Sequence, residues 1–423
     1  MDEVAGARLV PPRGTRDVLP AESRVRALIE RTGADLMAAN GFGRITTPTF
    51  EETEVFVRGV GTATDIVRKE MYTFDDRGGR SLTLRPEGTA PVARAYVENG
   101  MHKLPQPVKL WYLAPMFRYE APQSGRFREH WQVGAEAFGS EDPLLDVEMI
   151  ALLADLYDRL GVPGVRLRIS SMGDPDGRGL YRERLIAHLT PLADSLPRDA
   201  RERMDENPLR LFDMKDDAVQ AAMKDAPRLV DNLTDAALEH HTRVLDGLRL
   251  LDIPFDEDPT LVRGLDYYTR TVFEFTCDRL GAQSGIGGGG RYDGLVESLG
   301  GPDVPGVGFG TGVERITLAL GEEAASAQIV DVYLAIPDAD IRMQLMPVLR
   351  DLRRSGLRVE AGTAGKGLKA MMRHASGLGA VNVIIIGPRE HAEGVATVRD
   401  MQSGDQVEVP VSDLVARLSG GGA

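Results

Sequence analysis

The chain has 423 residues, of which 42% are hydrophobic and 27% are charged, and its formal net charge is -14. This length suffices for about two or three domains, and the acidic balance argues against a protein that coats nucleic acid through bulk charge, because phosphate neutralisation needs clustered lysines and arginines. No apolar run approaches the roughly 18 to 20 residues that cross a bilayer, and the N-terminus lacks the apolar core of a secretory signal, so we expect a cytoplasmic protein with no membrane partner.

The first part of the chain is predicted to contain an antiparallel sheet with flanking helices. Residues 70–86 have the pattern of a hairpin that turns at two consecutive glycines, and residues 108–120 pair naturally with residues 130–139. Residues 174–255 differ, because Leu, Ala and Met recur there with helical spacing and no convincing strand is present. We therefore expect a helical insertion between two strands of one core.

The last part of the chain has a different organisation. Residues 305–316 predict a strand that continues into a helix, with Arg315 in the first turns of that helix. Residues 329–423 then alternate between strands and helices, including a helix over 338–356, and they carry equal numbers of basic and acidic residues. The whole net charge therefore belongs to the preceding part. These changes predict a boundary near residues 322–328, followed by a small α/β domain with a mixed sheet.

One predicted strand, residues 130–138, has polar side chains along one face. Its apolar positions are Trp131, Val133, Ala135 and Ala137, and its polar positions are His130, Gln132 and Glu136. Because successive side chains of a strand point to opposite faces, one face joins a core and the other forms a polar wall. A solvated sheet face and a binding site explain this wall equally well.

The loop before this strand carries three arginines. Arg118 and Arg128 flank residues 119–127, a connection longer than a tight hairpin needs, and Arg126 lies near its end. The planar guanidinium group matches phosphate oxygens in a bidentate manner, so this arrangement suits a polyphosphate or an RNA end. The predicted anion is a nucleotide phosphate, held locally by a chain that is acidic as a whole.

Further polar residues lie where predicted strands begin or end. Glu87 and Thr89 stand at a turn from strand to helix, and Arg263, Tyr267 and Tyr268 precede another strand-like run. A run of four glycines follows, which allows close approach of the backbone to a ligand or to another strand.

Several common site types are excluded. No stretch fits the phosphate-binding loop or the dinucleotide fingerprint, and no serine lies in a nucleophile elbow. Seven scattered histidines and one cysteine, Cys277, give no metal-ligand spacing, and Cys277 reads as a small buried apolar residue. We therefore expect no metal site made of protein groups alone.

Taken together, these segments resemble the histidyl-tRNA synthetase family of class II aminoacyl-tRNA synthetases. The matching stretches are "PPRGTRDVLP", "TLRPEGTA", "FRYE" with "GRFRE", "LVRGLDYYTRTVFEF", "GGGRYDGLVESLGG" and "GVGFGTGVERI", in the order of the family. The resemblance implies an α+β fold with an antiparallel-sheet catalytic domain at residues 1–325, which contains the helical insertion at 174–255. It also implies an anticodon-binding domain at residues 329–423.

The resemblance further implies a histidine–tRNA ligase that uses ATP with Mg²⁺ to form histidyl-adenylate and then transfers histidine to the 3′ end of tRNA(His). Arg118 would hold the α-phosphate and Arg263 would contact the histidine carboxylate, as the two catalytic residues. The implied ATP-binding residues are Arg118, Arg126, His130 and Arg315, and the implied histidine-binding residues are Glu87, Thr89, Gln132, Glu136, Arg263, Tyr267, Tyr268 and Tyr292. Glu136 and Tyr268 would face the imidazole nitrogens.

Two positions depart from the family pattern. The family usually has arginine where Ala121 stands, which puts recognition of the tRNA acceptor end in doubt, and Phe-His where His130 and Trp131 stand. We expect the His130 ring to stack on adenine in place of the phenylalanine. Because histidine titrates near neutral pH, ATP affinity is then expected to vary between roughly pH 5.5 and 7.5.

Two alternatives belong to related proteins. A synthetase-like regulatory subunit of ATP phosphoribosyltransferase typically lacks the C-terminal domain and the arginines, and both are present here. A synthetase of another specificity is disfavoured by "LVRGLDYY" and "GGRYDGL".

Two expectations concern macromolecular partners. The stretch "FGRITTPTFEE", interrupted by Pro48, resembles the dimer-forming motif of the family, so we expect a homodimer. Lys366, Lys369 and the helix over 338–356 either contact the anticodon stem or form a solvated face.

Overall fold

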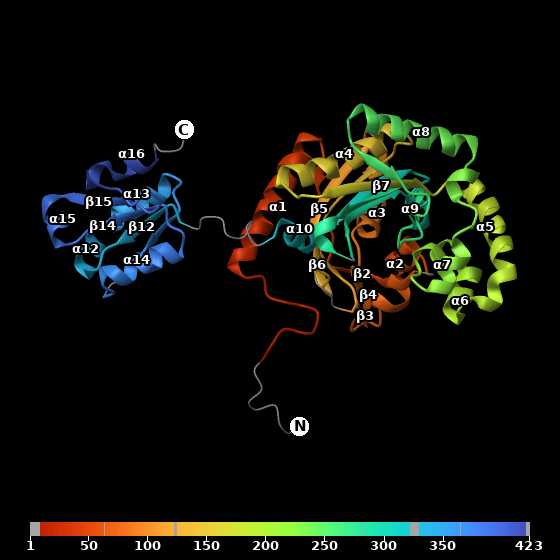
Figure 1. The fold of residues 1–423 in the computed structure, drawn as a ribbon, viewed down its shortest axis with the longest axis horizontal. Coiled ribbons are helices and arrows are strands. Elements are labelled where there is room, and N and C mark those ends of the chain that lie inside the picture. Colours follow the sequence, from red (N-terminus) through yellow and green to blue (C-terminus); the bar gives the residue numbers. More distant parts are fainter. Residues whose placement is uncertain are drawn as a thin grey trace, which may run out of the picture. The chain divides into compact units, whose positions relative to one another are not determined.

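The computed structural model describes residues 9–62, 64–121, 125–281, 283–321, 330–363 and 365–419. The chain divides into two compact units, residues 1–325 and 326–423 (Figure 1). The boundary expected near residues 322–328 lies outside the described residues. Among the described residues, no helix is both long and apolar enough to cross a membrane.

An eight-stranded sheet forms the centre of the larger unit, in the order β1-β5-β6-β11-β10-β9-β7-β8. The strands are β1 (Gly43–Arg44), β5 (Val108–Phe117), β6 (Glu129–Phe138), β7 (Val165–Ser171), β8 (Phe255–Glu257), β9 (Thr269–Cys277), β10 (Gly285–Arg291) and β11 (Gly306–Gly312). Every pair from β5 to β7 is antiparallel, as predicted. The short edge strands β1 and β8 pair in parallel with β5 and β7, which the sequence pattern did not indicate.

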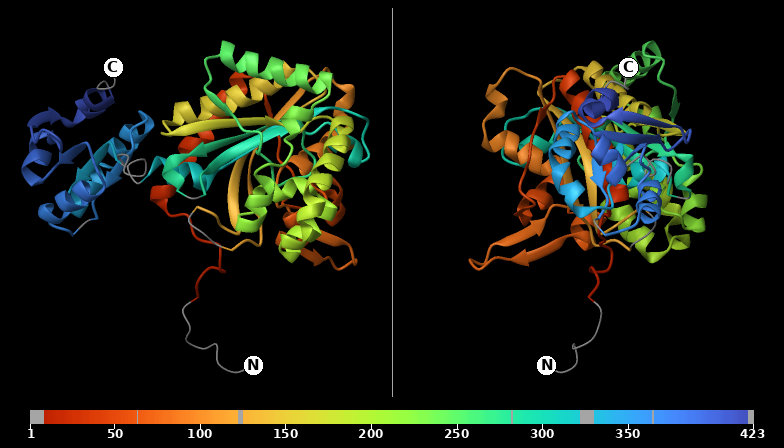
Figure 2. Two further views of the ribbon diagram at one scale, coloured as in Figure 1. Left: turned by 45° about the vertical axis from the view of Figure 1, so that its right-hand side comes forward. Right: turned by 90° about the vertical axis from the view of Figure 1, so that its left-hand side faces the viewer.

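A three-stranded sheet of order β2-β4-β3 contains the predicted glycine hairpin. Its strands are β2 (Phe50–Glu52), β3 (Tyr72–Asp75) and β4 (Ser81–Leu84). The Asp76 carboxylate accepts hydrogen bonds from the backbone N–H groups of Gly78 and Arg80, at 2.7 and 2.9 Å, which stabilises the turn. Both views of Figure 2 show this hairpin extending away from the main sheet.

Helices cover one face of the main sheet and form its principal hydrophobic core. They are α1 (Pro20–Ala39), α4 (Pro143–Leu160), α8 (Asp235–Leu250) and α10 (Val313–Leu320). Ile29, Ile150 and Val244 are fully buried with Val133 and Phe273 of the sheet. In Figure 1, α4 and α8 lie side by side along the sheet.

The opposite face of the sheet is covered as well. Helix α3 (Thr89–Glu98) and the short helix α9 (Leu295–Ser298) pack there with Tyr112, Phe138 and Tyr292. The polar wall predicted on β6 belongs to this face, and its residue Glu136 has no exposed surface. The wall is therefore not a solvated sheet face.

The segment between β7 and β9 is helical apart from the short strand β8 at its end, and β7 and β9 are neighbours in the sheet. It contains α5 (Pro175–Leu189), η3 (Thr190–Ser195), α6 (Arg198–Glu206), η4 (Pro208–Asp213), α7 (Asp217–Met223), η5 (Leu229–Asn232) and α8. The elements from α5 to η5 share a core with the face of the sheet that α3 covers, whereas α8 packs on α4. We use "insertion" below for residues 175–232. Shorter elements elsewhere in the unit are α2 (Thr53–Val60), η1 (Ile66–Glu70), η2 (Met101–Lys103) and η6 (Asp278–Leu280).

The smaller unit has a five-stranded mixed sheet of order β13-β12-β14-β15-β16, as predicted. Its elements are β12 (Val332–Ala335), α12 (Ala339–Gln344), α13 (Met346–Arg354), β13 (Val359–Ala361), α14 (Leu368–Gly377), β14 (Asn382–Ile385), α15 (Pro388–Glu393), β15 (Val395–Asp400), β16 (Gln406–Pro410), η7 (Val411–Asp413) and α16 (Leu414–Ser419). The helix predicted over 338–356 is divided at Leu345, because Pro347 has no N–H group to continue the helical hydrogen bonds.

A buried ion pair joins three elements of the larger unit. Asp146 on α4 and Arg291 on β10 have no exposed side-chain surface, and the Arg291 guanidinium donates to the Asp146 carboxylate. His240 Nε2 on α8 lies 3.3 Å from the same carboxylate. Burial alone would raise the pKa of Asp146, but the hydrogen bonds and charges of His240 and Arg291 hold it below its ordinary value. The ionised pair thus fixes α4 and α8 to the sheet.

Replacement of Asp146 by asparagine is expected to destabilise the larger unit by up to about 3 kcal/mol, because it removes the fully buried counter-ion of Arg291 and leaves Asp293, 3.3 Å away, as its acidic partner. Both tryptophans, Trp111 and Trp131, lie in this unit, so urea unfolding followed by tryptophan fluorescence reports on it alone. The control is Arg166→Ala, which removes an exposed pair with Asp278 and is expected to change stability by less than about 1 kcal/mol. Equal effects of the two variants would contradict this prediction.

Candidate active site

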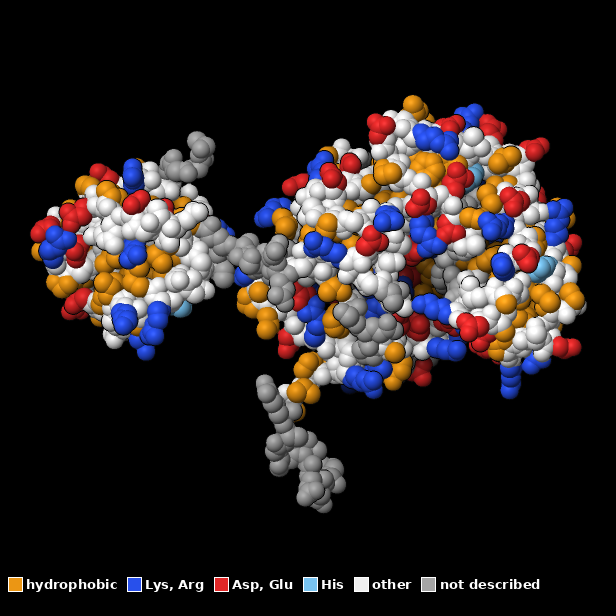
Figure 3. Space-filling model, in the orientation of Figure 1, with side chains coloured by type: hydrophobic (Ala, Val, Ile, Leu, Met, Phe, Trp, Pro, Cys, Tyr) orange, Lys and Arg blue, Asp and Glu red, His pale blue; other side chains and the backbone are white. Residues whose placement is uncertain are grey.

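A charged cavity of about 330 Å³ lies over the sheet where β6, β9, β10 and β11 meet the arginine loop. Six residues singled out in the sequence line it: Arg118, Arg126, His130, Gln132, Arg263 and Arg315. The four arginines are spread over almost 200 residues of the chain, from Arg118 to Arg315. The structure therefore brings the predicted cationic groups into one place, within a unit whose visible surface has acidic and basic side chains interspersed (Figure 3).

Three of these guanidinium groups are held by fixed acceptors. Arg118 Nε donates to the backbone carbonyl of Pro86 at 2.7 Å, and Arg263 Nη1 lies 2.8 Å from Glu274 Oε1. Arg315 is buried, and its Nε donates to the carbonyl of Gly285 at 2.9 Å. Such anchoring pre-orients the positive charges, which lowers the ordering entropy that an anion must overcome on binding. Arg126 is less constrained, since its side chain is 41% exposed and lies 3.6 Å from Glu120.

His130 faces this cavity in an environment that opposes its protonation. Burial, and secondarily the positive charge of Arg118, lower the pKa of His130 to about 3. The imidazole is therefore neutral throughout the range from about pH 5.5 to 7.5. The expected titration of His130 in that range is wrong, because the sequence pattern did not indicate that the ring would lie partly buried beside two arginines.

Next to the cavity, the second part of the site surrounds the carboxyl group of Glu136. Its Oε1 accepts from Thr89 Oγ1 at 2.8 Å and from the Tyr112 hydroxyl at 3.3 Å, and its Oε2 accepts from the Tyr292 hydroxyl. Burial raises the pKa of Glu136 to about 8, although the hydrogen bonds from Tyr292 and Thr89 oppose this rise. At neutral pH the carboxyl group is therefore mostly protonated in the ligand-free chain.

Glycines on β6 and β11 make room for these side chains. A Cβ atom added to Gly134 would lie 2.2 Å from Cζ of Tyr112, and one added to Gly308 would lie 1.8 Å from Oε2 of Glu136. Both distances are far below van der Waals contact. The two glycines are therefore required by the close approach of Tyr112 and Glu136 to the sheet.

Glu87 and Thr89 begin helix α3 at the edge of this second part. The buried Glu87 carboxylate accepts from the backbone N–H groups of Thr89 and Ala90, at 2.8 and 2.9 Å. Burial raises the pKa of Glu87, against the effect of these two bonds. The Thr89 hydroxyl meanwhile reaches Glu136, so Thr89 connects the two acidic groups.

Three predicted tyrosines, Tyr267, Tyr268 and Tyr292, form a cluster of rings in this second part of the site. The Tyr267 ring makes edge contacts with the rings of Tyr268 and Tyr292, at centroid distances of 4.8 and 5.5 Å. Burial opposes the charge of Arg263, but the neighbouring Tyr268 and Glu274 together raise the pKa of that arginine above its ordinary value. The structure thus places all eight candidate histidine-binding residues in the cavity wall or in the adjoining cluster.

Sequence reasoning missed several residues of the site. Tyr112 stands in an apolar strand and reads as a core residue, and only its register opposite Gly134 reveals its position. Glu120, Glu274 and Glu314 line the cavity and offset part of its positive charge. Glu314 accepts from the Trp131 backbone N–H at 2.9 Å, while Arg26 Nη2 of α1 lies 2.6 Å from its other oxygen. Within the described parts of the chain, no three His, Cys, Asp or Glu side chains gather as metal ligands.

Comparisons with known proteins cover almost the whole chain. Residues 14–173 and 180–316 match the family model of histidyl-tRNA synthetase, and residues 328–420 match that of the anticodon binding domain. A curated histidine–tRNA ligase of Desulforamulus reducens is 47% identical over 407 residues, which cover 96% of this chain and 97% of the relative. One of Geobacillus thermodenitrificans is 46% identical over 413 residues, with coverage of 96% and 97%.

Solved structures agree with this assignment. The crystal structure of apo histidyl-tRNA synthetase from Staphylococcus aureus has a TM-score of 0.81 and 35% identity, and it covers 97% of this chain and 100% of its own. A Bacillus halodurans protein described as an ATP phosphoribosyltransferase regulatory subunit/histidyl-tRNA synthetase has a TM-score of 0.64, but at 24% identity it shows the fold alone. The ligase relatives are thus favoured over the regulatory alternative, and the chain belongs to the histidyl-tRNA synthetase family.

Proposed function

We propose that this chain activates L-histidine with ATP and transfers the histidyl group to the 3′ end of tRNA(His). The observation that carries the proposal is the adjacency of two unlike environments: a cavity lined by four arginines and a buried carboxyl group surrounded by hydroxyls. The first suits a triphosphate, and the second suits a small side chain with two polar nitrogens.

In the first step, an oxygen of the histidine carboxylate attacks the α-phosphorus of ATP. The bond from that phosphorus to the bridging oxygen breaks, and pyrophosphate leaves with the electron pair. Arg118 stabilises the charge that develops on the α-phosphate, and Arg263 orients the histidine carboxylate and neutralises it as it approaches. Such preorganised charges act mainly by positioning and electrostatic stabilisation.

The remaining cavity residues hold ATP. Arg315 lies over the adenine and near the γ-phosphate, and Arg126 adds charge at the open side of the cavity. The neutral His130 ring provides a flat surface on which adenine stacks. A ring that stays neutral adds no further positive charge beside Arg118 and Arg126.

Two carboxylates of the cavity would hold Mg²⁺ together with ATP. The carboxylates of Glu120 and Glu274 line the same cavity as the arginines, and Mg²⁺ is commonly bound by one or two carboxylates plus substrate phosphates. The residues present therefore fit the ion. When bound, it neutralises phosphate charge.

The imidazole of histidine is recognised by Glu136 and Tyr268. Glu87, Thr89 and Gln132 hold the α-amino group, while Tyr267 and Tyr292 line the pocket. Any amino acid without two ring nitrogens leaves buried polar groups unpaired, and sites built in this way reject analogues by about 10⁴ to 10⁵.

The second step uses tRNA. A ribose hydroxyl at the 3′ end attacks the histidyl carbonyl, and AMP leaves. We assign the anticodon to the smaller unit, where Lys366 and Lys369 offer phosphate contacts, and we propose that the chain works as a cytoplasmic homodimer. The exposed pair Phe50 and Phe74 on the three-stranded sheet supports an interface at the motif that contains Pro48.

Histidine-dependent exchange of pyrophosphate into ATP tests the proposal. Exchange is expected with histidine alone among the amino acids, and Arg118→Ala is expected to reduce kcat/KM by about 10²- to 10³-fold, because a charge donor at the reacting phosphate is lost. Arg243→Ala, which removes an exposed arginine paired with Glu239 on α8, serves as the control. Exchange with another amino acid, or with none, would refute the proposal.

Glu136 is expected to make the stability of the chain depend on pH. Between its ordinary pKa of 4.5 and its folded pKa of about 8, the folded chain keeps a proton that the unfolded chain has released. Its contribution is therefore fully present below pH 4.5 and is lost as the pH rises to about 8. The free energy of unfolding should fall by up to about 1.4 kcal/mol per pH unit relative to Glu136→Gln. Urea unfolding at several pH values across this range checks the prediction. The control is Glu98→Gln, at an exposed glutamate, which should leave the pH dependence of the unfolding free energy as in the wild type.

His130 is expected to give ATP binding no pH dependence between about pH 5.5 and 7.5, because its pKa lies near 3. The KM for ATP in the exchange reaction should follow the same pH profile in wild type and in His130→Phe. A wild-type profile with a step in this range that the variant lacks would show that the ring titrates after all.

A further inference from the structure

The helical insertion contacts the loop that carries three candidate histidine-binding residues. This loop, residues 263–268, contains Arg263, Tyr267 and Tyr268 and is called the recognition loop below. Its side chains face the cavity and the tyrosine cluster, whereas its outer side meets η4 and α5 of the insertion. Contacts on this outer side can therefore determine where the binding residues lie.

Arg210 of η4 makes the most direct of these contacts. Its Nη2 donates to Asp266 Oδ1 at 2.8 Å, and its side chain is 12% exposed. Asn207 Nδ2 donates to the same oxygen at 3.1 Å. Asp266 immediately precedes the two tyrosines, and its backbone N–H is directed to the carbonyl of Val60 on α2, at 3.3 Å. The Asp266 carboxylate is thus held by two insertion residues.

A second arginine of the insertion binds the other end of the recognition loop. Arg178 of α5 donates from Nη2 to the backbone carbonyl of Tyr268. Two residues further along, Arg270 has a left-handed φ of 44°, a conformation that costs a non-glycine residue free energy. Its backbone N–H donates to the carbonyl of Gly173 at 2.8 Å, just before α5 begins. Arg178 of the insertion therefore holds the end of the loop, next to the bond that joins Gly173 and Arg270 just outside the two segments.

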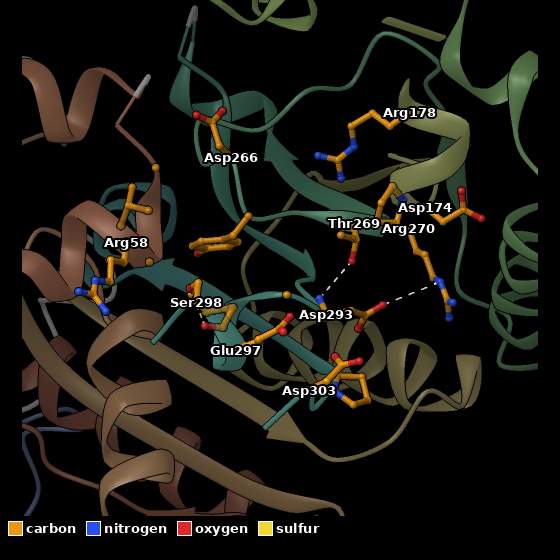
Figure 4. Close-up of a pocket in the computed structure, with 18 of the residues that line it drawn as sticks. Arg58, Asp174, Arg178, Asp266, Thr269, Arg270, Asp293, Glu297, Ser298 and Asp303 are labelled. Carbon is orange, nitrogen blue, oxygen red and sulfur yellow. Dashed lines mark hydrogen bonds and ion pairs between the residues drawn. The ribbon is translucent and has the colours of Figure 1, made fainter. Parts of the chain in front are cut away.

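Open space borders part of the loop, so its polar contacts matter for its position. A cavity of about 810 Å³ opens between α2, α5 and the start of β9, with Arg178, Asp266, Thr269 and Arg270 around it (Figure 4). Apolar packing supports the loop on two sides: Leu265 packs against Phe56 and Val60 of α2, and Leu211 of η4 joins Leu261 and Tyr268 in another hydrophobic cluster. The insertion adds both hydrogen-bond donors of the Asp266 carboxylate, so the position of the loop rests on α2 and on the insertion together.

We propose that the insertion positions the recognition loop for histidine binding and does so without tRNA, with Arg210 and Arg178 as positioning residues. This inference rests on the proposed function, because it concerns the activation of histidine. It assigns to the insertion a role in amino-acid activation, which precedes any contact with a nucleic acid.

Pyrophosphate exchange without tRNA tests the inference, because an insertion that serves only tRNA would leave this reaction unaffected. Arg210→Ala is expected to raise the KM for histidine by roughly 10- to 100-fold, since a hydrogen bond between charged groups is lost, and to change the KM for ATP by less than about twofold. Arg210→Lys keeps the charge and is expected to recover part of the loss. Asp266→Asn should act in the same direction, and the double variant should be no worse than the more affected single one.

The matched control is Arg198→Ala in α6 of the same insertion, whose side chain is 87% exposed and pairs within its own helix with Glu202. It is expected to leave both KM values unchanged. Tryptophan fluorescence verifies that each variant is folded, and Asp266→Asn carries the test if Arg210→Ala unfolds. An unchanged histidine KM, or equal rises in both KM values, would overturn the inference. Absence of exchange in the wild type would instead overturn the proposed function.

Discussion

The burial of one carboxyl group, Glu136, is the constraint on which the rest of the catalytic unit depends. A carboxyl group without exposed surface is tolerated only when hydrogen-bond donors satisfy its oxygens, and here the donors are hydroxyl groups from β5, α3 and the segment after β10. Gly134 on the same strand leaves space for Tyr112, and Gly308 on the neighbouring strand β11 leaves space for Glu136. A sheet that was filled with larger side chains could not hold this group, so the glycine content of β6 and β11 reflects the site.

The acidic chain and its cationic cavity are compatible because charge acts locally. At physiological salt, exposed charges separated by more than about 8 Å are largely screened, whereas groups inside a cavity interact through less water. Arg315 and Arg263 are mostly enclosed and held by protein acceptors, so their field remains strong where phosphates bind. Glu120, Glu274 and Glu314 limit the repulsion among the arginines.

Much of this arrangement could be predicted from the sequence. The paired strands around the arginine loop, the glycine hairpin and the strand leading to Arg315 follow from periodicity and turn residues, and family motifs indicated which residues meet. The surroundings of individual site side chains could not be predicted, because they depend on neighbours from distant segments of the chain. His130 lies beside Arg118, and Tyr112 reaches Glu136, only after the strands have paired. The split at Leu345 also went unpredicted, since the apolar spacing concealed the effect of Pro347.

The hydrogen bond between Arg270 and Gly173 joins positions separated by the entire insertion. Such a contact has a high sequence separation, so during folding it forms after short-range structure such as the β5–β6 hairpin. Amino-acid recognition consequently depends on pairing between segments that are far apart in the chain, because this bond continues the β7–β9 ladder. A nascent chain that has paired β5 with β6 but not β7 with β9 would still lack it.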